Sequence, residues 1–291
     1  MARYDLPDEA WTLIQPLLPA EPATPRAGRL WAEHRMIING MFWVLCSGAS
    51  WRDLRERYGP WKTVDHRFNR WSKTGVINNI FNRLLTLLNA NSLIDWSATA
   101  LYSSNIRALR CAAGGSKKHP DIAGDNVLGR SRGGFGTKIH LSTDGSGLPL
   151  NIVLSPGQAH ESLFAQRLLD GIGVQRQNGS MKRRGHAVLA DKAYSGHALR
   201  NELKNKGIKT VIPRKSNEKM ASDGRSQLDR DTYCNRNVVE RCFCSLKEYR
   251  RIATRYDKTA RNYLAMVKLG CIRKGYVIKG HSLKQLQRSS E

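Results

Sequence analysis

The chain has 291 residues, of which 48 are Lys or Arg and 24 are Asp or Glu, so its formal net charge is +24 at pH 7. A charge of this sign favours a polyanionic partner, with nucleic acid ahead of a membrane surface. No apolar run of about 18 residues is present, so we expect no membrane-spanning helix. The charged N-terminus predicts no signal peptide, and the six scattered cysteines are expected to be reduced.

All seven tryptophans lie at or before Trp96, which indicates a change of domain around residues 90–100. We therefore expect a helical domain over residues 1–92, a second domain over 93–280, and a disordered basic tail over 281–291. Helical spacing, caps and turn residues predict the elements of the first domain. Its expected helices are Asp8–Leu18, Trp31–Cys46, Trp51–Tyr58, Lys62–Lys73 and Ile77–Asn89.

The third and fourth of these helices flank the Gly59-Pro60 turn and form a helix-turn-helix pattern. In the second of the pair, Val64, Phe68 and Trp71 share the buried side, which leaves the cationic side chains outside. A helical bundle with a basic rim fits the same pattern. With the net charge, DNA binding is the favoured interpretation, through Lys62, Arg67, Arg70 and Lys73.

The second domain alternates strands and helices, which predicts an α/β fold with a mixed sheet. A hairpin turn at residues 144–147 joins its first two clear strands. Residues 214–230 are polar and are expected to be flexible. The expected strands are Phe135–Thr143, Leu148–Leu154, His186–Asp191 and Ile208–Pro213, and the expected helices are His160–Gly171, Ser195–Lys206, Asp231–Arg251 and Asn262–Ile278.

Two acidic residues stand out in this domain. Asp191 ends a buried apolar strand, and Glu240 lies on the expected helix Asp231–Arg251, beside an apolar stripe. Two-metal phosphodiester chemistry needs carboxylates that converge from different elements, and Mg²⁺ prefers such oxygen ligands. Ligands of open α/β sheets bind beyond the carboxyl ends of the strands, where Asp191 is expected. A solvated charged edge is the alternative interpretation.

Basic and aromatic residues accompany these acids. In the spacing Y-x2-R-x3-E-x6-K, Tyr233, Arg236 and Lys247 share the line of Glu240 on one helix. The two cations could hold DNA phosphates, and the tyrosine could stack on a base or contact a phosphate. In a glycine-rich segment, Arg130 and Arg132 either clamp DNA or belong to a mobile basic loop.

Taken together, four motifs resemble the bacterial insertion-sequence transposases of family five, which are DDE enzymes. They are the Tyr-Arg-Glu-Lys spacing, D-K-A-Y at Asp191, G-R-S-R-G-G-F-G-T-K-I-H at Gly129–His140, and G-L-P-L…P-G-Q-A-H-E at Gly147–Glu161. The resemblance implies a ribonuclease-H-like mixed sheet after a helix-turn-helix domain, with Asp191 and Glu240 as the second and third catalytic carboxylates. It also implies Mg²⁺ (or Mn²⁺), a homo-oligomer on double-stranded DNA at transposon ends and target, strand cleavage and transfer, and a place at the bacterial nucleoid in the cytoplasm.

The sequence departs from that family at one position. Reading back from Ile106-Arg107-Ala108, the expected first catalytic Asp falls on Tyr102, whose phenol is neutral at pH 7 and cannot act as an anionic ligand. Asp95 is too far along the strand, and Asp144 is expected at the opposite end of the sheet. Glu161 is the remaining substitute ligand. We therefore expect DNA binding with poor cleavage or none.

Two other functions stay open at this point. A non-catalytic DNA-binding protein or repressor on the same scaffold would bind the ends and give no products. A nonspecific metal nuclease would cut any duplex and join no strands. Both would bind DNA with strong salt dependence, so the salt slope does not separate them from a transposase.

Overall fold

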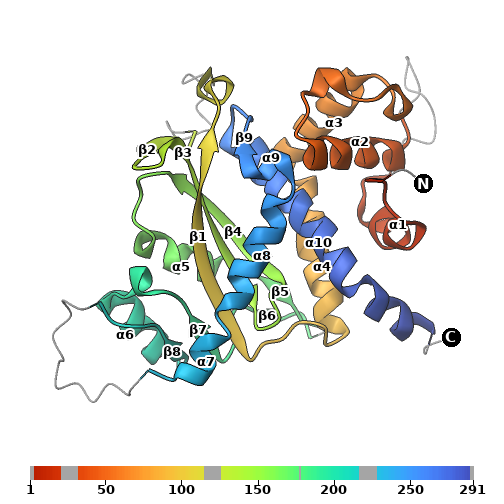
Figure 1. Cartoon of the computed structure of the whole chain (residues 1–291). Helices are drawn as coiled ribbons and strands as arrows, with labels where there is room; N and C mark the ends of the chain where they lie inside the picture. The colour runs from red at the N-terminus through yellow and green to blue at the C-terminus, as the bar shows by residue number, and fades with distance from the viewer. Residues whose placement is uncertain (1–2, 21–31, 115–125, 177, 216–227, 289–291) are drawn as a thin grey trace.

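The computed structural model describes residues 3–20, 32–114, 126–176, 178–215 and 228–288. The helical region lies at one end of the molecule and the sheet at the other, with α4 and α10 between them (Figure 1). Within the described residues, no helix combines the length and apolar character needed to cross a membrane. The first part of the chain forms α1 (Asp8–Ile14), α2 (His34–Ser47), α3 (Trp61–Lys73) and α4 (Val76–Ala90).

Local sequence explains most of the boundaries in the helical region. Gly48 ends α2 in the left-handed conformation, with φ of 70°, which is the stop that the sequence predicts. The expected helix Trp51–Tyr58 is instead two 3₁₀ turns, Trp51–Asp53 and Glu56–Tyr58, the first capped by Ser50. Apolar side chains of α2, α3 and α4, including Val64, Phe68 and Trp71, are buried as expected.

The main sheet is mixed, as predicted, and its strands follow the order β4-β3-β1-β7-β8. β3 is antiparallel to β1 and β4, whereas β7 is parallel to both β1 and β8. This is the arrangement of a ribonuclease-H-like sheet. Its five main strands are β1 (Ala98–Ala108), β3 (Gly134–Asp144), β4 (Pro149–Pro156), β7 (Ala187–Leu189) and β8 (Lys209–Val211). Two short strands extend it: β2 (Gly129–Ser131) pairs with the start of β3, and β9 (Thr254–Arg255) pairs with the end of β1. A separate two-stranded sheet consists of β5 (Val174–Gln175) and β6 (Met181–Lys182).

Helices cover both faces of this sheet. On one face Phe243 of α8 contacts the ring of Tyr102, and on the other Phe164 of α5 stacks on His140 of β3. Residues 102 and 140 lie on opposite faces because Tyr102 pairs with Leu141 and successive side chains alternate. The helices of this part are α5 (Ser162–Asp170), α6 (His197–Asn205), α7 (Arg230–Cys234), α8 (Asn237–Lys247), α9 (Arg250–Ala253) and α10 (Ala260–Arg288).

Four expectations need correction or fall outside the described residues. The single helix expected over Asp231–Arg251 is divided into α7, α8 and α9. The closing helix α10 continues to Arg288, so the segment expected to be a disordered tail beyond Gly280 is helical as far as that residue. The glycine-rich segment, for which a loop was one of two interpretations, forms the β2–β3 hairpin. Most of the polar stretch expected to be flexible, residues 216–227, lies outside the described residues.

Candidate functional site

The candidate site forms where β1, the end of β7 and α8 meet. Tyr102 lies in the middle of β1. Asp191 follows β7 and caps the 3₁₀ turn Lys192–Tyr194, where its Oδ1 accepts a hydrogen bond of 2.8 Å from the Ala193 amide. Glu240 lies in the first turn of α8. The structure therefore brings the region of the expected first Asp together with both predicted acids.

The charges of these groups influence one another. Burial raises the pKa of Tyr102 above its ordinary value, and the carboxylates of Glu240, Asp191 and Glu161 raise it further while Arg236 opposes them. Burial also raises the pKa of Asp191, with a further contribution from Glu161. The phenol of Tyr102 is therefore kept neutral near pH 7, which agrees with its inability to act as an anionic ligand.

Cations of the chain already accompany the acids. Arg236 Nη1 lies 2.7 Å from Glu240 Oε1, and Lys138 Nζ lies 3.4 Å from Glu161 Oε1. Lys247 Nζ donates a hydrogen bond of 2.7 Å to Ser104 Oγ, which fastens α8 to β1 two residues beyond Tyr102. Each side-chain acid of the site thus has a cation or a backbone amide as its partner.

The donor set as it stands does not fit a divalent metal. Of the residues that the structure describes, no three His, Cys, Asp or Glu side chains lie close enough together to hold a metal ion. At position 102 a phenol ring occupies the space beside the acids and packs edge-on against Phe243, with ring centroids 5.7 Å apart. Mg²⁺ requires near-octahedral oxygen ligands, and a neutral phenol supplies no compensating charge.

The other carboxylates considered as substitutes are placed differently. Asp144 pairs with Thr99, three residues along β1 from Tyr102, and is fully buried. Its side chain accepts hydrogen bonds from the amides of Asp95 (2.9 Å) and Leu148 (2.7 Å), so it stabilises the hairpin turn, at the end of β3 where we expected it. Glu161 begins α5 beside the site and stays the nearest substitute ligand.

The predicted signature of Tyr233, Arg236, Glu240 and Lys247 does not lie on one helix. Asp229 caps the short α7, where it accepts from the Thr232 amide at 2.9 Å. Residues 235 and 236 separate α7 from α8, and Arg236 stands at the N-cap position of α8 without a side-chain capping hydrogen bond. Only Glu240 and Lys247 lie within α8, so the prediction of one uninterrupted helix for all four residues was wrong. The guanidinium of Arg236 nevertheless lies over the Tyr233 ring, 5.5 Å from its centroid.

The predicted DNA-contacting residues differ in exposure. Lys62, Arg70 and Lys73 are exposed on α3, and Arg130 and Arg132 are exposed on the β2–β3 hairpin. The prediction for Arg67 was wrong, because this side chain is only 7% exposed. Its Nη1 donates to His34 Nδ1 at 2.8 Å, and its guanidinium lies over the Trp71 ring. It therefore ties α3 to α2 instead of facing solvent.

Two polar residues near the site were missed in the sequence. Lys138 and His140 lie on the α5 side of β3, and only 8% and 0% of them are exposed. Lys138 Nζ donates 2.8 Å to the Ala159 carbonyl, which holds it against the loop before Glu161. His140 Nε2 pairs with Ser155 Oγ at 2.8 Å, and burial lowers the pKa of His140 to about 3. The sequence signal that could have found them is T-K-I-H in the predicted strand, because side chains two residues apart, such as Lys138 and His140, point to the same face of a sheet.

Comparison with known proteins decides the family. Residues 93–273 match the family described as a transposase DDE domain, and residues 6–81 match the one described as a putative transposase of the IS4/5 family. The chain belongs to the DDE transposases of insertion sequences. This agrees with the family that the sequence motifs resemble.

Several relatives of this transposase cover part of its length. A putative transposase of insertion element IS6501 from Brucella ovis is 35% identical over 136 residues, which are 46% of this chain and 94% of the relative. An uncharacterised 16.2 kDa protein of element IS402 from Burkholderia cepacia is 39% identical over 135 residues, 44% of this chain and 88% of the relative. The putative transposase of IS402 is 30% identical over 51% of this chain and 65% of its own length.

Solved structures are more distant. The Mos1 transposase paired-end complex with the left transposon end has 14% identity and a TM-score of 0.25, over 88% of this transposase and 82% of that chain. A likeness at this level adds nothing to the family assignment.

Proposed function

We propose that this transposase binds double-stranded DNA at the ends of its insertion sequence, and that in its present form it cleaves that DNA poorly or not at all. The observation that carries the second half is Tyr102. It lies on β1 among Asp191, Glu240 and Glu161, at the position where the family resemblance implies a carboxylate. With Asp at 102, acids from three different elements would converge, as metal-assisted phosphodiester cleavage requires.

Charge and exposure support the DNA-binding half. The chain carries a net charge of +24, and exposed cations line α3 and the β2–β3 hairpin. Lys247 and Arg236 border the acids, so a strand that reaches the site would meet cations beside the carboxylates. Contacts of this kind neutralise phosphates and position a duplex without reading its sequence.

A non-catalytic DNA-binding protein or repressor is the second candidate. It is favoured by the pairing of Glu240 with Arg236 and of Glu161 with Lys138, because these acids already have partners without a metal. Under this candidate the acidic site is a structural remnant, and the basic surface is the functional part.

Cleavage of a duplex that carries the element's terminal sequence separates the two candidates. With Mg²⁺ or Mn²⁺ as the cofactor, we expect the wild type to give few or no products and Tyr102→Asp to nick at the ends. Tyr102→Asp combined with Glu240→Gln is the matched control and should be inactive. A wild type that cuts as fast as Tyr102→Asp would show that the position of the first ligand is wrong. Equal binding without cleavage by all three proteins would favour the repressor.

A further inference from the structure

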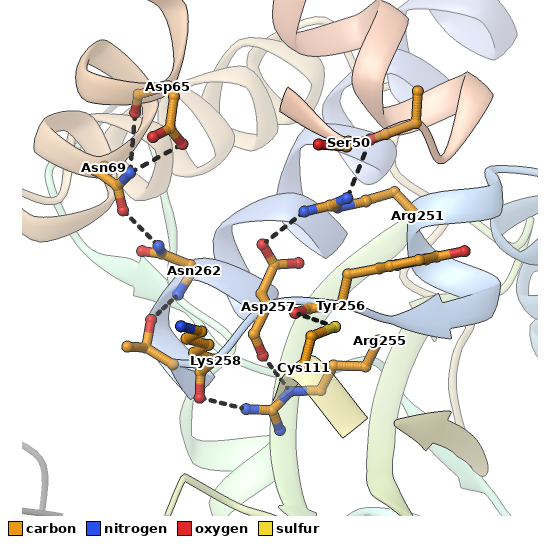
Figure 2. A network of polar contacts seen from close by, with 12 residues as sticks. Ser50, Asp65, Asn69, Cys111, Arg251, Arg255, Tyr256, Asp257, Lys258 and Asn262 are labelled. Atoms are coloured by element: carbon orange, nitrogen blue, oxygen red, sulfur yellow. Dashed lines mark hydrogen bonds and ion pairs between the residues drawn. The ribbon is translucent and has the colours of Figure 1, made fainter. Parts of the chain in front are cut away.

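After α8 the chain returns to the helical region through residues 250–262, which contain α9, β9 and the start of α10 (Figure 2). β9 pairs in parallel with the end of β1, the strand that carries Tyr102. α9 begins three residues after α8, the helix that carries Glu240, has ended. This connecting segment is therefore attached to two of the elements that build the acidic site.

Arg251 joins the connecting segment to the helical region. Its Nη1 donates a hydrogen bond of 3.1 Å to the carbonyl of Ala49, directly after the glycine that ends α2 and 202 residues away in sequence. Its Nη2 lies 3.4 Å from Asp257 Oδ1, and its guanidinium lies over the Tyr256 ring at 4.8 Å. Arg251 as a whole is only 5% exposed, and its side chain has a contact on three sides.

Two further contacts belong to the same junction. A Cβ atom on Gly48 would lie 2.7 Å from Arg250 Cβ, so the end of α2 and the start of α9 approach as closely as only glycine permits. Asn262 Nδ2 donates to Asn69 Oδ1 of α3 at 2.5 Å, and Asn69 is bonded in turn to Asp65 (Figure 2). The connecting segment therefore touches both α2 and α3.

Arg255 holds the other side of the segment on the sheet. It is fully buried, and its Nε donates to the Asp257 carbonyl at 3.0 Å. Its Nη1 donates to Thr137 Oγ1 of β3 and to the Val127 carbonyl. The Asp257 residue thus lies between two arginines, one directed to the sheet and the other to the helical region.

The Arg251–Asp257 pair is not optimised for stability alone. Arg251 Nε and Asp257 Oδ2 are buried without a hydrogen-bond partner, and buried ion pairs with unsatisfied atoms are often no more stable than apolar residues of similar size. The pair instead fixes the orientation of the connecting segment relative to the end of α2.

We infer that Arg251 is a positioning residue, which holds the basic face of α3 and the acidic site at one fixed placement. The inference rests on the proposed DNA binding by the helical region. A duplex bound on α3 would then meet the acidic site at a set distance, and DNA binding at α3 would be transmitted to α8 through the connecting segment.

The test uses a variant that keeps the core filled. Arg251→Met with Asp257→Leu removes the bond to Ala49 without leaving a buried, unpaired carboxylate. Arg83→Met, on an exposed position of α4, is the matched control. Because six of the seven tryptophans lie at or before Trp71, tryptophan fluorescence reports mainly on the helical region, while hydrogen exchange of β3 amides reports on the sheet.

In urea, we expect the two probes to report one midpoint for the wild type and for Arg83→Met. In the double variant the fluorescence midpoint should fall below that of the β3 amides. A purely structural role would lower both midpoints together. Coincident midpoints in the double variant would overturn the inference.

A second arm adds a labelled duplex with the element's terminal sequence. Binding should slow amide exchange in α3 of all three proteins, and in α8 of the wild type and the control only. Slowed exchange in α8 of the double variant would contradict the inference. If α3 is unaffected by the duplex in every protein, DNA binding by the helical region is wrong, and the urea arm alone decides the role of Arg251.

Discussion

Replacing Tyr102 with Asp should make the stability of the protein depend on Mg²⁺. Without metal, the variant loses the edge-on contact with Phe243, worth about 0.5–1.5 kcal/mol. It also gains a carboxylate beside Asp191 and Glu240, which repel it. We therefore expect the melting temperature in EDTA to fall below that of the wild type.

Mg²⁺ should more than reverse this loss in the variant. At a free metal concentration about 100 times Kd, binding to the folded state alone adds about 2.7 kcal/mol. Since 1 kcal/mol shifts the melting temperature of a domain of 150–250 residues by about 2–4 °C, the expected rise is roughly 5–10 °C. Differential scanning fluorimetry in EDTA and in Mg²⁺ measures it.

The matched control is Tyr102→Asn, which has nearly the same shape as the Asp variant and no charge. It should respond to Mg²⁺ no more than the wild type does. The reasoning would be refuted if the wild type gained as much from Mg²⁺ as Tyr102→Asp, or if Tyr102→Asn responded equally. Either result would mean that the metal binds elsewhere.

Two further predictions concern the surface and the core. Arg70→Ala with Lys73→Ala should weaken binding to any duplex and reduce the slope of log K against log salt by up to about 2, measured by fluorescence anisotropy, whereas Arg167→Ala on α5 should leave the slope unchanged. Because burial lowers the pKa of His140 to about 3, the unfolded state binds its proton more readily below pH 6.5. Its contribution to stability is full above that pH and falls by about 1.4 kcal/mol per pH unit towards pH 3. Urea unfolding at pH 7 and pH 5 should show a smaller acid loss for His140→Gln than for the wild type, and equal losses would contradict this.

The mixed sheet and the place of Asp191 directly after a buried strand could be predicted from the sequence. A strand that ends abruptly in Asp191 must place that carboxylate at the edge of the sheet, because the side chain follows the last buried residue of β7. The hairpin at residues 144–147 likewise fixed the pairing of β3 with β4, since its Asp144 and glycines favour a turn. Both features depend only on residues adjacent in the sequence, so the sequence alone is enough to predict them.

The break between α7 and α8 could not be predicted in the same way. The apolar spacing of Val239, Phe243 and Leu246 is helical, but all three residues follow Asn235, so the stripe carries no information on where α7 ends. The start of α7 depends on a tertiary contact, because Lys209 Nζ of β8 lies 2.5 Å from Oδ2 of the capping Asp229. The spacing of apolar residues within one helix does not reveal this contact, because Lys209 and Asp229 are 20 residues apart in the sequence.

Arg67 and Arg251 illustrate the same limit for charged residues. The sequence analysis predicted that Arg67 contacts DNA and did not single out Arg251, yet both residues are buried. Arg67 is held by His34, and Arg251 by Ala49 and Asp257. Burial of a cation depends on distant partners that satisfy its donors, so charge and local spacing do not reveal it.

The most direct test of the account is the position of a bound metal. Crystals of Tyr102→Asp grown with Mn²⁺ should show an anomalous peak within coordination distance of the carboxylates at 102, 191 and 240, and wild-type crystals should show none there. A peak at the same position in the wild type, or a peak in the variant away from Asp191 and Glu240, would contradict the claim that Tyr102 stands where a metal ligand is missing.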